Sequence, residues 1–218
     1  MVWDWAFVWE ILPDLLRGLR ITVQATLLGT ALALVVGLVL ALLRRSGIRA
    51  VSMAAGAFVE FVRSTPLLVQ LLFAFFAQPI LGVRLSALVT GIIVLGLHYA
   101  TYTSEVYRAG IEGIPRGQWE AARALNLPPR RTWTGVVLPQ AIPPVVPALT
   151  NYFIAMYKDT PLLLAIGVGE VLLTARVIGS ATFRFLEPIT MVGVLFFLVS
   201  YPSALLLRRL EARFARSG

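Results

Sequence analysis

Residues 21–43 form a run without a single charged side chain. As an α-helix, these roughly 23 residues rise about 34 Å, which is enough to cross a hydrocarbon core of about 30 Å. Small residues recur at every fourth position of the run, namely Gly29, Ala33, Gly37 and Ala41. Such a stripe lets a neighbouring helix approach closely. We therefore expect a membrane-spanning helix whose small-residue face packs either within this chain or against a second subunit.

The composition of the 218-residue chain indicates that several segments of this kind are present. Hydrophobic residues make up 58% of the chain, charged residues make up 14%, and the mean hydropathy is +0.83. These values are typical of a polytopic membrane protein. The net charge of +8 would suggest nucleic acid for a soluble protein, but arginines beside apolar spans set membrane orientation instead. We expect membrane lipid and no nucleic acid as a partner. Without cysteine, and with His98 as the single histidine, we expect no metal site.

The apolar segments predict an all-α protein with about five transmembrane helices in a single domain, residues 1–218. Pro66 lies inside the second segment and implies a kink. A polar break at Lys158 interrupts the fourth, and the apolar residues 161–173 beyond it suggest a broken or re-entrant continuation. Residues 174–187 are interpreted as a polar connection. The expected spans are residues 18–43, 58–80, 85–108, 139–157 and 188–207.

Arginine placement predicts the orientation of the spans. With five crossings the termini face opposite sides, and one side receives twelve arginines against five on the other. The larger group is Arg44, Arg45, Arg49, Arg108, Arg116, Arg123, Arg130, Arg131, Arg208, Arg209, Arg213 and Arg216. The smaller group is Arg17, Arg20, Arg84, Arg176 and Arg184. By the positive-inside rule, the carboxyl terminus and the loop 113–131 are cytoplasmic, and the amino terminus lies outside.

The amino-terminal residues do not resemble a cleaved signal. They are aromatic and acidic, and they lack a basic start. Trp3, Trp5 and Trp9 suggest anchors at the membrane interface on a short amphipathic segment. Targeting is then expected from the first span itself.

The loop 113–131 has the pattern of a short helix with defined ends. Pro115 suits a first helical turn, where its missing N–H costs nothing. Asn126 tolerates the left-handed conformation that closes a helix, and Pro128 and Pro129 prevent its continuation. A helix over residues 115–125 has about three turns, too few for stability in water by itself. We therefore expect this helix to pack on something else.

The same loop carries the sequence Glu120-Ala121-Ala122, followed by Asn126 and by Val-Val-Leu-Pro at residues 136–139. This spacing resembles the EAA loop of ABC importer permeases. Two positions depart from that pattern, because Asn126 replaces a glycine and the first valine of 136–139 replaces an isoleucine. Asparagine is the next-best residue for a left-handed position, so we expect the turn to be retained.

Three further segments, residues 63–70, 107–122 and 158–162, resemble the polar amino-acid (histidine/glutamine-type) branch of that family. The aromatic start is also similar to permeases for ectoine and hydroxyectoine. The resemblance implies the type I ABC importer transmembrane-domain fold in a multi-pass protein of the bacterial inner membrane. It implies that this chain binds no cofactor and that ABC ATPase subunits use the ATP. A second permease subunit, identical or homologous, and an extracytoplasmic binding protein that delivers a polar amino acid or compatible solute are further implied partners.

The resemblance also implies that the helix over 115–125 couples this chain to an ATPase subunit. Trp119, Ala122 and Leu125 would form a narrow apolar docking face. Glu120 would meet a basic group of the ATPase, unless it is only a solvated loop charge. The expected coupling residues are Trp119, Glu120, Ala121, Ala122, Arg123, Leu125 and Asn126.

Polar side chains within the expected spans form a second group of candidates. Charges at membrane depth are costly, and they usually pair within the protein or line a water-filled path. They would therefore either contact a zwitterionic solute or satisfy one another as a structural network. His98 is interpreted as a packed span residue, and Glu60 is a further charge near the second span. The candidate substrate path consists of Arg63, Gln70, Tyr99, Glu105, Asn151, Lys158 and Asp159.

A self-contained secondary transporter or channel is the main alternative. Secondary transporters commonly carry internal repeats, and no second copy of the pattern at 115–139 is present. The chain also contains no metalloprotease motif, nucleophile elbow or phosphate-binding glycine loop. A transport subunit without a catalytic or ATPase site of its own is therefore favoured over a membrane enzyme.

Overall fold

The computed structural model describes residues 3–215, with side chains for residues 3–209, and this part of the chain contains helices and no β-strand. Arg216 and the side chain of Arg213 lie outside the described part. The helices are α1 (Trp5–Arg44), α2 (Arg49–Arg63), α3 (Leu67–Ala77), α4 (Ala87–Glu112), α5 (Arg116–Ala124), α6 (Pro129–Thr132), a π-helical turn (Trp133–Val137), α7 (Leu138–Asp159), a 3-10 helix (Thr160–Ile166), α8 (Val171–Thr182) and α9 (Leu186–Ala215).

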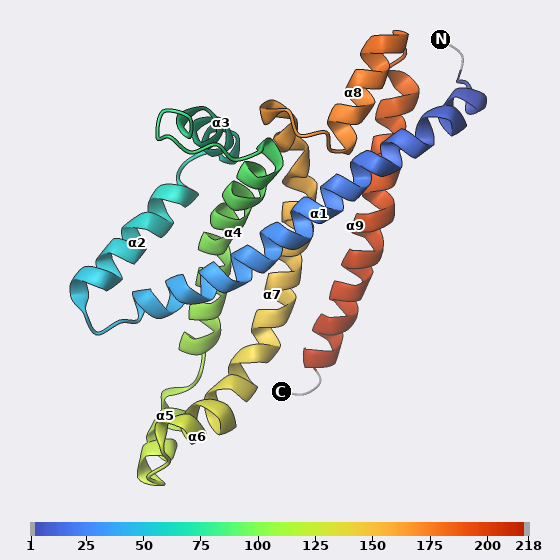
Figure 1. The fold of residues 1–218 in the computed structure, drawn as a ribbon. Coiled ribbons are helices and arrows are strands. Elements are labelled where there is room, and N and C mark those ends of the chain that lie inside the picture. Colours follow the sequence, from blue (N-terminus) through green and yellow to red (C-terminus); the bar gives the residue numbers. More distant parts are fainter. Residues whose placement is uncertain (1–2, 216–218) are drawn as a thin grey trace.

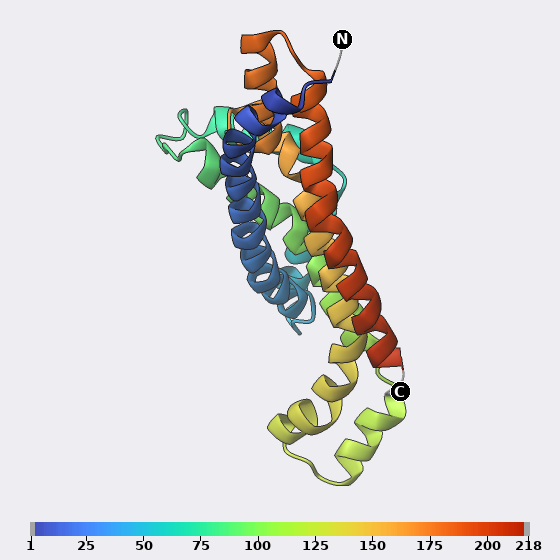
Figure 2. The same cartoon turned by 90° about the vertical axis from the view of Figure 1, so that its right-hand side faces the viewer.

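The long helices pack side by side, and the short helices lie at their two ends (Figure 1). Helix α1 crosses α4, with which it makes its most extensive contact, and α7 packs between α4 and α9. Figure 2 shows α5 and α6 projecting beyond one end of the long helices. Helices α3 and α8 lie at the opposite end. This arrangement separates a loop-borne helix from the membrane-spanning part of the chain.

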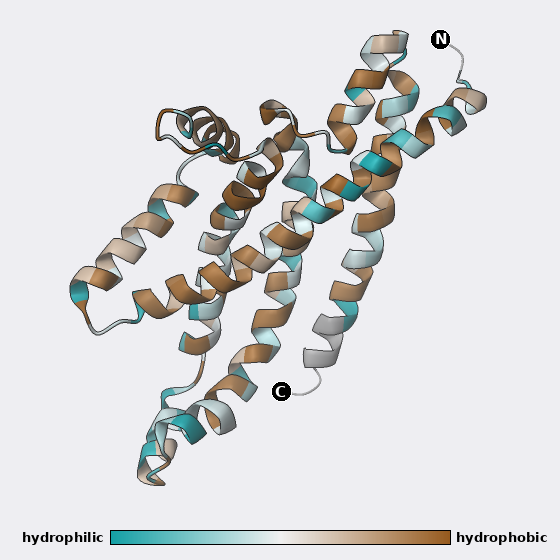
Figure 3. Ribbon diagram, in the orientation of Figure 1, coloured by the Kyte–Doolittle hydropathy of each residue, from teal (hydrophilic) through white to brown (hydrophobic). Residues whose placement is uncertain are grey.

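Within the described residues, three helices are long and apolar enough to cross a membrane, namely α1, α4 and residues 186–209 of α9. Two bent pairs raise the number of candidate spans to five when each pair is counted as one. Figure 3 shows apolar residues along these helices and a more polar α5–α6 region. The fold is therefore that of an all-helical polytopic membrane protein, with three to five candidate spans.

The second expected span, residues 58–80, differs from the structure. Helix α2 ends at Arg63, and α3 begins at Leu67. The angle between the two helix axes is 104°, which is far larger than the kink that the sequence predicts. Proline lacks an N–H donor and disfavours helical geometry at the residue before it. Pro66 lies at the start of α3 with φ −64° and ψ 135°, which is an extended conformation. The proline therefore separates two helices and does not bend one.

The expected polar connection at residues 174–187 is also corrected, because α8 occupies most of it. The Glu170 side chain caps this helix by accepting hydrogen bonds from the Leu172 and Leu173 N–H groups at 2.9 and 2.7 Å. A side-chain cap satisfies N–H groups that a helix start leaves free. The apolar residues before the cap form the 3-10 helix and a turn at Gly167, whose φ is +79°. Trp5 and Trp9 likewise belong to α1 itself, and Trp3 precedes the helix, so the three tryptophans do not lie on a separate short helix.

The stripe of small residues on α1 packs within this chain. Ala33 and Ala41 are buried, and a Cβ on Gly37 would overlap the Thr103 hydroxyl of α4. That hydroxyl donates a hydrogen bond to the Ala33 carbonyl at 2.8 Å, which requires this close approach. At Gly29, a Cβ would lie 2.9 Å from the Met156 sulfur of α7. Of the two uses expected for the stripe, the structure shows the intramolecular one.

Candidate functional site

The loop helix α5 has the ends that its sequence predicts. Pro115 precedes its first residue, and Asn126 adopts the left-handed conformation with φ 50°. The Asn126 N–H donates to the Arg123 carbonyl at 2.9 Å, and the Leu127 N–H donates to the Ala122 carbonyl at 3.0 Å. These two bonds are the pair that closes a Schellman motif. The turn expected from asparagine in place of glycine is confirmed.

The inner side of α5 packs on the base of the loop. The Trp119 ring lies edge-on to Trp133 with 5.8 Å between ring centroids, and Ala122 is 3% exposed. Leu125, by contrast, is 72% exposed. Two of the three residues expected to form a docking face therefore pack against this chain. Trp119 and Ala122 form the apolar face of α5. This face packs against the π-helical turn before α7, because an apolar helix face is buried against apolar surface.

The outer side of α5 is charged and open. Glu120, Ala121 and Arg123 are all exposed. Among the described side chains, Glu120 forms no ion pair. A hollow of about 390 Å³ lies beside it, lined by Arg116, Trp119, Glu120, Arg123 and Thr132. An exposed carboxylate on a rigid, end-capped helix is available to a partner with a positive charge.

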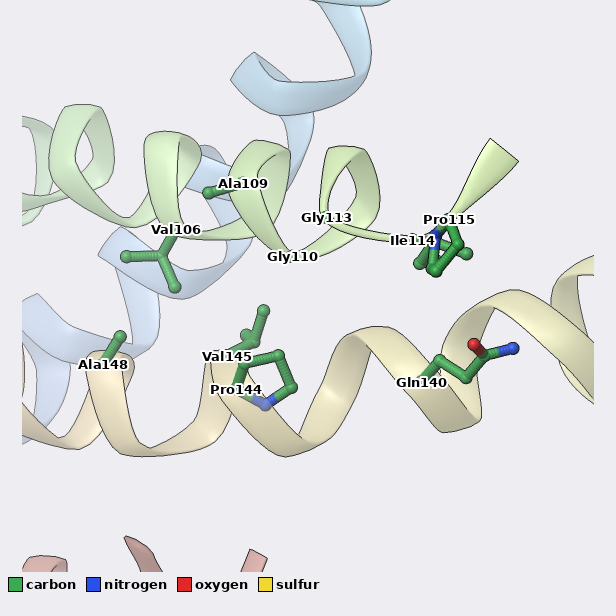
Figure 4. A pocket seen from close by; sticks show the side chains of 10 residues that line it. All are labelled: Val106, Ala109, Gly110, Gly113, Ile114, Pro115, Gln140, Pro144, Val145 and Ala148. Carbon is green, nitrogen blue, oxygen red and sulfur yellow. The ribbon is translucent and has the colours of Figure 1, made fainter. Parts of the chain in front are cut away.

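A second cavity of about 510 Å³ lies between α4 and α7, next to the loop (Figure 4). The two helices approach closely along it, since a Cβ on Gly110 would overlap the Val145 side chain. Among its lining side chains none is charged. The cavity is lined by Val106, Ala109, Gly110, Gly113, Ile114, Pro115, Gln140, Pro144, Val145 and Ala148. It separates the loop from the polar residues deeper in the helices.

Glu105 and Arg63 belong to one ionic network. The Glu105 carboxylate accepts hydrogen bonds from Arg44 of α1 and from Arg108, the latter at 2.9 Å from Nε and 2.7 Å from Nη2. Arg63 of α2 approaches the same carboxylate to 3.7 Å. Three arginines from three helices thus share one acid, whose side chain is 23% exposed. Glu105 and Arg63 therefore pair within the protein and form part of a structural network, and neither is a free side chain for contact with a substrate.

Gln70 completes the bend between α2 and α3. Its Nε2 donates to the Val62 and Thr65 carbonyls at 2.7 and 3.0 Å, and to the Thr65 hydroxyl at 2.7 Å. Its Oε1 lies 3.1 Å from Nδ1 of His98 on α4. Backbone carbonyls freed at a helix break inside a membrane must be satisfied by the protein. Gln70 therefore stabilises the break, and His98 is a packed residue as expected.

Tyr99 and Asp159 lie together in the membrane-spanning part. The Tyr99 hydroxyl donates to Oδ2 of Asp159 at 2.7 Å and joins α4 to the end of α7. Tyr102 and Tyr152 pack against the Tyr99 ring, with 6.0 and 6.3 Å between centroids. The Arg63 guanidinium lies 5.1 Å from the centre of the Tyr102 ring, a distance at which a cation is attracted to the ring face.

The sequence did not identify Tyr102 and Tyr152 as members of this cluster. Tyr102 follows Tyr99 by about one helical turn, and Tyr152 precedes Asp159 by seven residues, or about two turns, so spacing alone could have indicated both. Glu60, Asn151 and Lys158 are exposed and lie outside the cluster. Because Asn151 and Lys158 are seven residues apart, they share one face of α7.

The fold and the projecting loop define an integral transport subunit, and comparison with a solved protein supports this class. The crystal structure of an amino acid ABC transporter with histidines matches this chain with a TM-score of 0.91 and 32% identity. The match covers 98% of this chain and 100% of the transporter chain. The family of binding-protein-dependent transport system inner membrane components matches residues 29–216. The chain belongs to this family and is the permease subunit of an ABC importer.

Curated relatives match nearly the whole chain. A probable amino-acid ABC transporter permease protein of Sinorhizobium fredii is 44% identical over 213 residues, which are 98% of this chain and 92% of the relative. The glutamine transport system permease protein GlnP of Escherichia coli is 33% identical over 215 residues. The matched residues are 98% of this chain and 98% of GlnP. The importer interpretation is therefore confirmed over the alternative of a self-contained transporter or channel. As expected of such a permease, this chain is a multi-pass membrane protein.

Proposed function

We propose that this permease imports a polar amino acid or an amino-acid-derived compatible solute across the bacterial inner membrane. An extracytoplasmic binding protein delivers the solute, and cytoplasmic ATPase subunits supply the energy. The names of the relatives, which include glutamine and amino-acid permeases, support the amino-acid class. A companion permease subunit, identical or homologous, shares the path. The amino terminus faces outward and the carboxyl terminus and α5 face the cytoplasm, in accord with the arginine distribution.

One observation supports the coupling role of α5. Glu120 is exposed on one side of this helix, while the opposite side packs against the chain through Trp119 and Trp133. Residues 113–115 join α5 directly to α4, and the Trp119–Trp133 contact joins it to the turn before α7. A displacement of α5 by an ATPase subunit would therefore reach two long helices at once. Glu120 supplies the charge for docking, while Ala121 is small enough to permit close approach.

Reversal of the Glu120 charge tests this role. In vesicles that contain the complete transporter, Glu120→Lys should reduce ATP-driven solute uptake at least about tenfold, since like charges at an interface cost several kcal/mol. Gln118→Lys is the matched control, because it adds a positive charge to the same exposed helix. Uptake should be measured together with the amount of ATPase subunit that co-purifies. Wild-type uptake by the Glu120→Lys transporter would disprove the coupling role.

For the solute path, we propose the cluster around Tyr99 and Asp159. Asp159 provides a negative charge for an ammonium group, and the ring of Tyr152 offers a face for the same cation. The exposed face of α7 with Asn151 and Lys158 lies next to this cluster along the helix and would complete the path where the companion subunit closes it. Lys158 there supplies a positive charge for a carboxylate. Arg63 and Glu105 hold the surrounding helices.

A further inference from the structure

The turn between α8 and α9 lies at the end of the molecule opposite α5 (Figure 1). Its first residue, Phe183, adopts the left-handed conformation with φ 55° and ψ 25°, and its side chain is 85% exposed. A bulky residue in this conformation costs about 1–2 kcal/mol. Because the side chain is 85% exposed, packing against the described residues does little to offset that cost. The turn therefore presents an aromatic ring outward at an energetic disadvantage.

The neighbouring Arg184 fixes the turn to the start of α1. Its guanidinium pairs with Glu187 and lies 3.2 Å from Oδ2 of Asp4. The same group lies 4.2 Å from the centre of the Phe7 ring. The Asp4 side chain also caps α1, because its Oδ1 accepts a hydrogen bond from the Ala6 N–H at 2.9 Å. Arg184 thus joins the turn to two helices through two ion pairs and a cation–π contact.

Phe185 fixes the other side of the turn. Its ring lies against Gly179 of α8, where an added Cβ would come within 2.5 Å of the ring. The α8–α9 turn is therefore closed by a contact that only glycine permits. Because Arg184 and Phe185 both contact neighbouring helices, they constrain the backbone of the turn, and the Phe183 ring remains exposed.

The turn extends beyond the apolar part of α1. Glu10, Arg17 and Arg20 place charges on the amino-terminal half of that helix, and they are exposed. Gly18 lies between Arg17 and Arg20 and packs against Val171, the first residue of α8. Helix α8 then rises about 18 Å over its 12 residues before it reaches Phe183. The ring therefore lies past the charged section of α1, near the level of Asp4, which the neighbouring Arg184 contacts.

We infer that Phe183 is an anchor that inserts into the extracytoplasmic binding protein when that protein docks. The inference rests on the proposed function and adds the contact residue. The family to which the chain belongs is binding-protein-dependent, so a protein partner must meet this end of the molecule. Exposed aromatics in rigid positions are the typical hot spots of protein interfaces, and rigidity lowers the entropic cost of association. A ring that only anchored the turn in lipid headgroups would need no fixed left-handed backbone.

The test uses the complete transporter in vesicles and the purified, solute-loaded binding protein that stimulates the wild-type ATPase activity. Phe183→Asn removes the ring and suits the left-handed conformation, whereas Phe183→Tyr keeps a ring. Ile80→Asn is the matched control, because Ile80 is 86% exposed in the turn between α3 and α4 at the same end. ATPase activity is measured as the binding-protein concentration is raised.

We expect Phe183→Asn to raise the half-saturating concentration of binding protein about tenfold or more, the effect of losing an aromatic hot spot. The maximal activity should be unchanged, and Phe183→Tyr and Ile80→Asn should remain near wild type. An unchanged half-saturating concentration, an equal shift for Ile80→Asn, or a loss of transporter from the membrane would overturn the inference. Absence of stimulation in the wild type by any binding protein would instead count against the proposed function.

Discussion

Replacement of Glu105 by glutamine would show how strongly the ionic network holds the helices together. The change keeps the size of the side chain but removes the charge that Arg44, Arg63 and Arg108 share. Loss of one partner of a buried pair costs about 3–5 kcal/mol, whereas an exposed pair contributes about 0–1 kcal/mol. Glu105 is 23% exposed, so we place the loss of stability between these limits, at about 2 kcal/mol. Three guanidinium groups would then remain close together, and among the described side chains only Arg108 would keep a carboxylate partner, Glu112.

Thermal unfolding of the purified protein in detergent measures this loss. Glu112→Gln is the control, because Glu112 pairs only with Arg108 among the described side chains and is 48% exposed. It should cost less than about 1 kcal/mol. The Arg44→Met change combined with Glu105→Gln should cost less than the sum of the two single changes, since the partners couple. Equal midpoints for Glu105→Gln and Glu112→Gln would refute the assignment of Glu105 to a structural network.

Three other residues give predictions about stability and about solute uptake. Gly37→Ala should destabilise the protein by about 1–3 kcal/mol in the same unfolding assay, because its Cβ would overlap Thr103. Gly56→Ala on α2, where nothing lies within 4 Å, should instead stabilise by up to about 1 kcal/mol. Asp159→Asn retains an acceptor for the Tyr99 hydroxyl but removes the charge, so the KM for solute uptake should rise about tenfold with little change in unfolding. An unchanged KM would remove Asp159 from the solute path.

Local sequence rules predicted the features that neighbouring residues determine. Pro115 and Asn126 defined the ends of α5 within one residue, because helix caps depend on the conformation of single positions. The small-residue stripe predicted the close approach along α1. The choice between an internal and an intersubunit partner depended on Thr103, which lies 70 residues away along the chain from Ala33.

Features determined by distant residues could not be predicted in the same way. Pro66 indicated only a kink, whereas the separation into two helices at 104° depends on how α3 packs against α4 and the 3-10 helix. Trp119 was assigned to a docking face because Trp133, its actual partner, follows only after an intervening turn and α6. The contact between Asp4 and Arg184 joins residues that are 180 positions apart in the chain, and no periodic pattern indicates it.

Cross-linking from a single cysteine would show whether α5 meets an ATPase subunit. The chain contains no cysteine, so Ala121→Cys introduces a unique attachment point on the exposed side of α5. After labelling with a photoactivatable maleimide, the assembled transporter should give an adduct between this chain and the ATPase subunit. Ile80→Cys, at the opposite end, should give none. An ATPase adduct from position 80 and none from position 121 would contradict the account.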